Sequence, residues 1–114
     1  MRNLWIVSFY SKEIKQEIEK FPRGILAKYA RLTTMMETYG PYIGMPHTKH
    51  LGKGLIELRL KAIEGIGRVF YTTVYKNEIV ILHSIIKKTE KTPQKDLNVA
   101  YKRLMEVHRD EKIT

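Results

Sequence analysis

Residues 55–88, LIELRLKAIEGIGRVFYTTVYKNEIVILHSIIKK, carry the strongest pattern in the chain. Apolar and polar side chains alternate over residues 55–61, which predicts a strand with one buried face and one polar face. Residues 68–75 are rich in β-branched and aromatic side chains, which favours a central strand. Residues 79–86 form a nearly continuous apolar run, which is typical of a strand covered on both faces. Short turn sequences separate these segments, so we expect three neighbouring strands.

The chain before this predicted sheet indicates one more strand and two helices. Residues 4–10, LWIVSFY, are aromatic and β-branched, as in a strand. Apolar residues then recur at helical spacing across residues 12–39, with Pro22 interrupting the pattern, which predicts a helical hairpin with one apolar face. Residues 41–54 contain two prolines and three glycines and are expected to form a loop.

Thr92 and Pro93 predict the start of the last helix, because threonine is a common N-cap and proline is tolerated at the first helical position. Apolar residues from Leu97 to Leu104 make this helix amphipathic. The expected order is therefore β-α-α-β-β-β-α within a single domain of residues 1–114. This is an α+β fold, in which the N-terminal helical hairpin and the C-terminal helix cover one face of a mostly antiparallel sheet.

The composition excludes several functions and favours a polyanionic partner. The 114-residue chain has no cysteine, which excludes disulfides and thiolate sites and is consistent with a reducing cytoplasm. No apolar run approaches the roughly 20 residues that cross a membrane, and the N-terminus is too short and too soon polar for a signal peptide. The formal net charge of +9 favours binding to nucleic acid, an anionic membrane surface or an acidic protein, the alternative being a solvated lysine-rich surface.

The chain lacks the residue patterns that most hydrolytic enzymes use. There is no Gly-x-Ser-x-Gly turn, no glycine-rich phosphate loop before a helix, and no pair of carboxylates on the predicted strands. His47 and His50 lie three residues apart without a third ligand close by in sequence, so we expect neither a metal nor a cofactor. Lys49 and Lys53 in the same loop are candidates for contact with phosphate, the alternative being plain solvent exposure.

The polar residues of the predicted sheet favour phosphoryl-transfer chemistry without a metal. Cleaving RNA in this way needs a base for the ribose 2′-OH, a cation for the charge that builds on the phosphate, and an acid for the departing 5′ oxygen. Arg68 is the candidate cation, because its planar guanidinium binds two phosphate oxygens at once. Lys87 and Lys88 can add charge or move a proton. Glu57 and His83 are the conventional base candidates on these strands.

The same strands offer contacts to RNA, and several of their residues also have a structural interpretation. Tyr71 can orient a group or stack on a base. Arg59 beside Glu57 can be a surface ion pair, and His83 in its apolar run can be a hydrogen-bonded core histidine. The two lysines that follow the run can be a solvated strand end. A nucleic-acid-binding module without catalysis therefore fits these residues as well as a nuclease does.

Three blocks of the sequence resemble a known family. They are HLGKGLIELR at residues 50–59, GRVFY at residues 67–71 and IVILHSIIKKTEKTP at residues 79–93. Together they resemble the RelE/ParE toxin superfamily, and most closely its HigB-like, phage Gp49-like branch. The arginine at the start of the second hairpin strand in this family matches Arg68, and the basic residue at the end of the following strand matches Lys88.

The resemblance implies the toxin of a bacterial type II toxin–antitoxin pair. RelE- and HigB-like toxins enter the ribosomal A site and cut messenger RNA without a metal, using the 2′-OH as nucleophile. ParE-like toxins share the fold and block DNA gyrase, and an inactive RNA-binding relative is a third alternative. The implied partners are the ribosome, mRNA and a helix-turn-helix, DNA-binding antitoxin that binds the basic surface or displaces the last helix.

The expected site combines a catalytic set and a binding set. The catalytic set consists of Glu57, Arg68, Lys87 and Lys88, and the set for binding RNA or the ribosome consists of Lys49, Lys53, Arg59, Tyr71 and Lys91. Two features of RelE are missing from the sequence: the lysines of the strand that here reads LIE at residues 55–57, and the tyrosine early in the last helix, where residues 94–96 read QKD. The resemblance therefore leaves the general base and the general acid unassigned.

Overall fold

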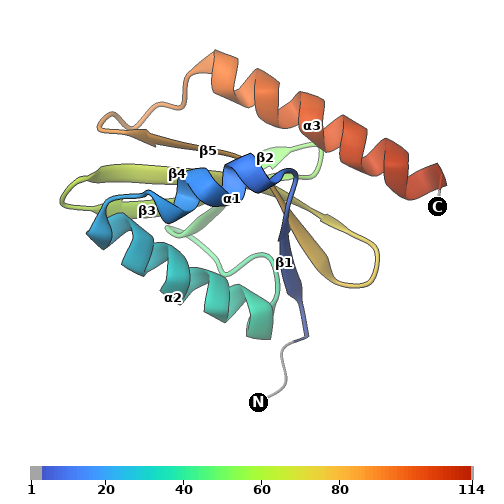
Figure 1. Ribbon diagram of the computed structural model, residues 1–114, viewed down its shortest axis with the longest axis horizontal. Coiled ribbons are helices and arrows are strands. Elements are labelled where there is room, and N and C mark those ends of the chain that lie inside the picture. The colour runs from blue at the N-terminus through green and yellow to red at the C-terminus, as the bar shows by residue number, and fades with distance from the viewer. Residues whose placement is uncertain (1–3, 114) are drawn as a thin grey trace.

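A five-stranded sheet forms the centre of the molecule, with helices packed against it (Figure 1). The structure is a computed structural model that describes residues 4–113. Along the described chain the elements are β1 (Ile6–Phe9), α1 (Lys12–Glu19), α2 (Arg23–Tyr39), β2 (Thr48–Gly52), β3 (Leu55–Ala62), β4 (Gly65–Val74), β5 (Glu78–Lys87) and α3 (Gln94–Ile113). The predicted order is confirmed except for β2, which lies in the segment expected to form a loop.

The sheet is mostly antiparallel, as expected. Its strand order is β1-β5-β4-β3-β2, with β1 parallel to β5 and the other neighbours antiparallel. The β-branched and aromatic strand β4 lies in the middle, which confirms its predicted place. The parallel pair joins segments that are far apart in the chain, since Ile6 lies opposite Glu78.

The helices cover both faces of the sheet, so the expectation that they share one face is wrong (Figure 1). The core under α1 and α2 contains Ile14, Ile18, Ile25, Leu32, Ile56, Leu58, Leu60, Ile79 and Ile81. The core under α3 contains Leu55, Phe70, Val80, Leu82, Ala100 and Leu104. Successive residues of a strand point to opposite faces, and β4 and β5 place buried apolar residues on both, so each face requires a cover.

A β-bulge in β5 determines which residues face α3. Phe70 lies opposite His83 and Tyr71 opposite Ile81, so Leu82 is the extra residue on β5. His83 therefore points to the same face as Leu82, and its ring stacks on Phe70 with the centroids 6.0 Å apart. Strict alternation from Ile81 would instead have turned His83 towards α1 and α2.

β2 is a short edge strand that the sequence pattern did not predict. It pairs with β3 so that Lys49 lies opposite Glu57, and the register shifts between His50 and Gly52. The turn into β3 runs through Lys53, whose φ of 57° lies in the left-handed region. An edge strand of this kind is held by main-chain hydrogen bonds to its neighbour, so its own side chains need not alternate. Its effect on the site is to bring Lys49 beside Glu57.

The segment between β5 and α3, residues 88–92, crosses the face of the sheet that α3 covers, and we call it the strap. The Pro93 carbonyl accepts the main-chain hydrogen bond of Leu97 at 3.3 Å, and α3 begins at Gln94. The Thr92 hydroxyl donates to the Glu57 carboxylate at 2.9 Å. The prediction that Thr92 caps the helix is wrong, because the Pro93 carbonyl accepts the first helical hydrogen bonds and Pro93 therefore occupies the N-cap position.

Candidate functional site

Arg68 on the central strand β4 lies at the centre of the site, and its side chain is 0% exposed. Its Nη2 donates to the main-chain carbonyls of Thr89 and Glu90 in the strap, at 2.6 Å and 2.5 Å. Burial lowers the pKa of the guanidinium, and the nearby Glu57 carboxylate opposes that shift. Among the described residues, neither its Nε nor its Nη1 has a hydrogen-bond partner. The strap thus covers a cation whose hydrogen-bonding capacity is only partly used.

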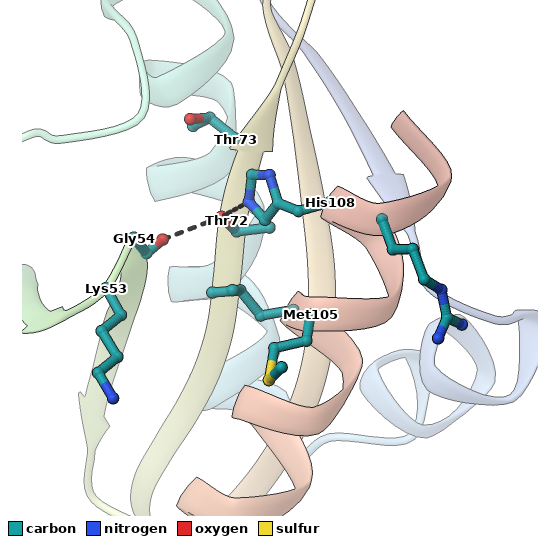
Figure 2. A pocket seen from close by; sticks show the side chains of 8 residues that line it. Lys53, Gly54, Thr72, Thr73, Met105 and His108 are labelled. Atoms are coloured by element: carbon teal, nitrogen blue, oxygen red, sulfur yellow. Dashed lines mark hydrogen bonds between the residues drawn. The ribbon is translucent and has the colours of Figure 1, made fainter. Parts of the chain in front are cut away.

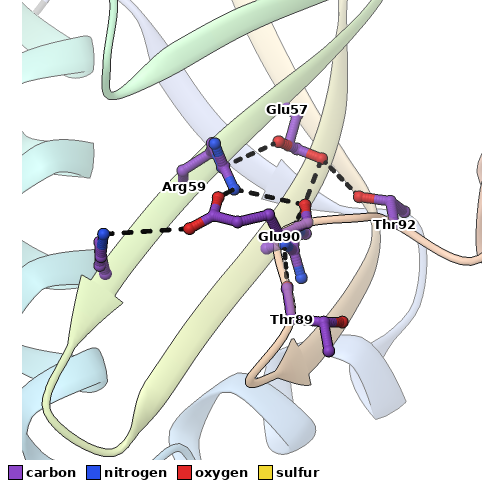
Figure 3. A network of polar contacts seen from close by, with 7 residues as sticks. Glu57, Arg59, Thr89, Glu90 and Thr92 are labelled. Carbon is purple, nitrogen blue, oxygen red and sulfur yellow. Dashed lines mark hydrogen bonds and ion pairs between the residues drawn. The ribbon is translucent and has the colours of Figure 1, made fainter.

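Glu57 on β3 lies between two guanidinium groups and the strap (Figure 3). It is 4% exposed, so the interpretation of its pair with Arg59 as a surface contact is wrong, although the pair itself forms. The Glu57 carboxylate lies 3.4 Å from Arg59 Nε and 3.9 Å from Arg68 Nε. Together with the hydrogen bond from Thr92, these contacts make Glu57 the anionic centre around which the cations gather.

Glu90 extends from the strap over β3 and contacts two cations (Figure 3). One carboxylate oxygen lies 2.5 Å from Arg59 Nη2 and the other lies 3.9 Å from Lys61 Nζ. The hydrogen bond from Arg59 holds the pKa of Glu90 below its usual value. The Glu90 side chain is 68% exposed, so this contact forms at the surface above buried Arg68. Lys61 and Glu90 were not among the predicted site residues.

Two grooves meet at Arg59 and Glu90. The first, of about 590 Å³, is bordered by β2, β3, the strap and the start of α3, and its polar lining includes Lys49, Glu57, Arg59, Glu90 and Lys91. The second, of about 200 Å³, lies beside α2, and its lining includes Lys28, His47, Arg59, Lys61 and Glu90. Cationic side chains therefore line both grooves, and Glu90 lies on the boundary between them.

The fold brings together most of the residues that the sequence pointed to. Lys49, Glu57, Arg59 and Lys91 line the first groove, and Arg68 lies beside them beneath the strap. Lys87 ends β5 opposite Ile66, and Lys88 is the exposed first residue of the strap. Within residues 4–113, neither lysine has a hydrogen-bonded or ionic side-chain partner. Their catalytic roles stay predictions.

Two predicted binding residues lie elsewhere. Tyr71 is 0% exposed on the face under α1 and α2, and its hydroxyl donates to the Pro41 carbonyl. A side chain buried there cannot stack on a base, so that expectation is wrong, and burial also raises the pKa of its hydroxyl. Lys53 lines a third pocket near the end of α3 (Figure 2), and it does not border either groove.

His83 is held by a residue of α3. Its Nε2 lies 2.8 Å from Asp96 Oδ1, and the His83 side chain is 16% exposed. This contact agrees with the interpretation of His83 as a hydrogen-bonded structural histidine. Neither His83 nor Asp96 borders the two grooves, so the pair lies outside the site described above.

The third pocket, of about 520 Å³, contains a chain of polar contacts that ties α3 to the sheet (Figure 2). His108 Nε2 lies 3.0 Å from Thr72 Oγ1 and its Nδ1 lies 3.3 Å from Glu111 Oε1. The Thr72 hydroxyl donates to the Gly54 carbonyl at 2.9 Å and Thr72 is 1% exposed. A buried hydroxyl that already donates is not available as a nucleophile, so this acid–histidine–hydroxyl arrangement is structural.

Lys28 and His47 join the site only through the fold. Lys28 on α2 donates from Nζ to the Lys61 carbonyl at 3.1 Å, which places it at the end of β3. No sequence signal marked Lys28, because it lies in a helix predicted to pack on the sheet.

Within residues 4–113 no group of three His, Cys, Asp or Glu side chains can hold a metal. The His50 ring stacks on Tyr42, with the ring centroids 4.4 Å apart.

Residues 16–105 match a family model described as phage-derived protein Gp49-like. The chain belongs to this Gp49-like family. The fold of the Gp49-like chain is also similar to the archaeal RelE–RelB complex from Pyrococcus horikoshii, with a TM-score of 0.55, 16% sequence identity, and coverage of 77% of this chain and 99% of that chain. These matches confirm the resemblance to the RelE superfamily and the RelE-like fold. No curated protein sequence matches the chain, and no helix among its described residues is long and apolar enough to cross a membrane.

Proposed function

We propose that the chain is the toxin of a bacterial toxin–antitoxin pair and that it cuts messenger RNA on the ribosome. Family membership and the RelE-like fold support the toxin class. The observation that carries the nuclease proposal is the convergence of Arg59, Arg68, Lys49 and Lys91 around Glu57. Cations of this kind, beside one carboxylate, suit the chemistry of a phosphodiester.

The proposed reaction needs no metal. A base removes the proton of the ribose 2′-OH, the 2′ oxygen attacks phosphorus, and the bond to the 5′ oxygen breaks, which leaves a 2′,3′-cyclic phosphate and a protonated 5′-OH. Arg68 stabilises the negative charge on the phosphate in the transition state. Glu57 is the proposed base. Lys87 and Lys88 add positive charge and supply the proton for the leaving oxygen.

Primer extension on mRNA from cells that express the protein tests this proposal. Discrete cuts in phase with codons are expected for the wild type, and their absence with intact growth arrest contradicts nuclease activity. Lys88→Ala is the informative variant, because Lys88 is exposed and its loss should not affect folding. It should weaken cleavage, whereas Lys76→Ala, which removes an exposed charge from the β4–β5 turn at the opposite end of β5, should not.

A gyrase-blocking toxin is the second candidate, and the burial of Arg68 favours it. A side chain that is 0% exposed does not meet a phosphate unless the strap moves, whereas inhibition of an enzyme by binding needs no such movement. Intact mRNA together with defects in plasmid supercoiling would select this function. The same experiment therefore separates the two candidates.

The proposed partner besides the ribosome is an antitoxin encoded by a neighbouring gene. The similar archaeal RelE was solved with RelB, and the formal net charge of +9 favours an acidic partner surface. A helix-turn-helix antitoxin fits the sequence resemblance, and a ribosomal target implies a cytoplasmic location. Co-expression with the product of the neighbouring gene should yield a stable complex and restore growth.

A further inference from the structure

We propose that the Glu90 carboxylate is an internal substitute for an RNA phosphate, and that it divides one continuous cationic channel into the two grooves. Single-stranded RNA displaces Glu90 and the strap, and its backbone then runs from Lys49 past Arg59 to Lys28 and His47. The choice of RNA as the ligand rests on the proposed function. The channel itself, its extension beside α2 and its closure by Glu90 go beyond it.

The contacts of Glu90 are those expected of an anion bound in the middle of such a channel. Its two carboxylate oxygens face two different cations, Arg59 at 2.5 Å and Lys61 at 3.9 Å. The two non-bridging oxygens of a phosphodiester can contact the same pair. Arg59 and Glu90 line both grooves, so moving the Glu90 side chain away joins the grooves along Arg59.

Two hydrogen-bond donor nitrogens of Arg68 remain without a hydrogen-bond partner within residues 4–113 while the strap is closed over it. Its side chain is 0% exposed, and its Nε and Nη1 have no hydrogen-bond partner among the described residues. A buried cationic donor without a partner is costly. Its Nη2 is occupied by carbonyls of Thr89 and Glu90, which belong to the strap. Lifting the strap frees all of these donors for a phosphate.

The strap is held in a way that allows displacement. Residues 88–91 are exposed. The side-chain contacts that hold the strap are the Glu90 pairs with Arg59 and Lys61, the hydrogen bond from Thr92 to Glu57, and the hydrogen bonds that Arg59 and Arg68 donate to strap carbonyls. Exposed ion pairs contribute little to stability, because each charge is well hydrated when the pair is broken. Opening also breaks the two hydrogen bonds from buried Arg68, and a phosphate can replace them because its oxygens accept from the same guanidinium.

The shape of the channel favours a single strand. The first groove is bordered by α3 and the second by α2, and these helices lie on opposite faces of the sheet (Figure 1). A ligand that contacts both grooves must therefore turn around the edge of the sheet. Duplex nucleic acid is stiff over this distance, whereas a single strand bends freely and follows a cationic groove.

Removing the charge of Glu90 tests the proposal directly. The probe is a short single-stranded RNA with every 2′-OH methylated, which cannot be cleaved by 2′-OH attack. Glu90→Gln should bind it about five- to tenfold more tightly than wild type, because the open state no longer competes with an internal anion. The control is Glu17→Gln on exposed α1, which raises the net charge by the same amount. Equal affinities for the two variants would overturn the proposal.

A second comparison tests whether Glu90 divides the channel. Lys28→Gln should barely change RNA affinity in the wild type, where Glu90 blocks the route to Lys28, and should weaken it about threefold or more in Glu90→Gln. Lys76→Gln, in the exposed β4–β5 turn at the opposite end of β5 from the strap, should have the same small effect in both backgrounds. Equal effects of Lys28→Gln in the two backgrounds would show that the grooves are not joined.

These results are independent of the nuclease assay. If Glu90→Gln binds the methylated RNA more tightly but mRNA stays intact in cells, the channel is correct and the proposed cleavage is wrong. If mRNA is cut while Glu90→Gln binds like Glu17→Gln, the cleavage is correct and the internal-anion proposal is wrong. If neither variant binds the RNA, the channel proposal is overturned as well.

Discussion

Replacing Glu57 by alanine is expected to destabilise the protein strongly. Glu57 is 4% exposed and lies 3.4 Å from Arg59 and 3.9 Å from Arg68. Removing one partner of a buried ion pair costs about 3–5 kcal/mol, because the remaining charge stays buried without compensation. Arg68 is that remaining charge. We expect a loss of about 3 kcal/mol in the free energy of unfolding, at the low end of the range because Arg68 keeps its two carbonyl partners.

The same reasoning predicts strong coupling between Glu57 and Arg68. Arg68→Met removes the buried charge and keeps most of the side-chain volume, so it should cost clearly less than Glu57→Ala. In the double variant, the alanine no longer leaves a buried cation uncompensated. The combined loss should therefore be smaller than the sum of the two single losses by about 1–3 kcal/mol.

Urea unfolding followed by circular dichroism measures both quantities, with Glu17→Ala on exposed α1 as the control. A change in the midpoint at constant slope reports stability alone. For a domain of this size, about 3 kcal/mol corresponds to a fall of roughly 12 °C in the melting temperature. A loss below about 1 kcal/mol for Glu57→Ala, or additive losses in the double variant, would refute the view that Glu57 compensates buried Arg68.

Three further predictions follow from the described contacts. Leu104→Ala should cost about 2–4 kcal/mol in urea unfolding, because Leu104 is 6% exposed in the core under α3, whereas Met105→Ala at a 71% exposed position should cost little. Tyr71→Phe should lose about 1 kcal/mol with its buried hydrogen bond and leave RNA affinity unchanged, and a loss of affinity would place Tyr71 in the interface after all. Because Arg59 lowers the pKa of Glu90, that pair adds stability above the usual glutamate pKa of 4.5 and loses it as the pH falls through the lower folded value. An NMR titration of the Glu90 carboxyl carbon should therefore have its midpoint below 4.5, and a midpoint at or above 4.5 contradicts the contact.

Local sequence patterns were sufficient for most of the fold. The alternation over residues 55–61 and the apolar run over residues 79–86 predicted strands, and helical spacing over residues 12–39 predicted the hairpin. These patterns repeat within a few residues, and each reflects burial of one or both faces of a single element. They do not report which element supplies the cover, so the position of α3 on the second face was not predictable from them.

The sequence also pointed to several residues of the candidate site, because cations on strands are unusual enough to notice. Arg59 was expected on the polar face of its strand and Arg68 as the cation that binds phosphate, and the structure places both beside Glu57. The burial of Tyr71 was not foreseen, since an aromatic residue on a central strand has the same local pattern whether it faces a core or a ligand. Which face it occupies depends on the register of the whole sheet.

The contacts that cover the candidate site join distant segments of the chain. Glu90 meets Arg59 across 31 residues of sequence, and the strap covers Arg68 across 21 and 22 residues. Such contacts depend on the strand order, on the bulge at Leu82 and on where α3 begins. Sequence therefore specified which charges the protein carries on its strands. Tertiary packing determined which of them are buried, which are paired and which remain free to bind, because burial and pairing depend on neighbours that no local pattern encodes.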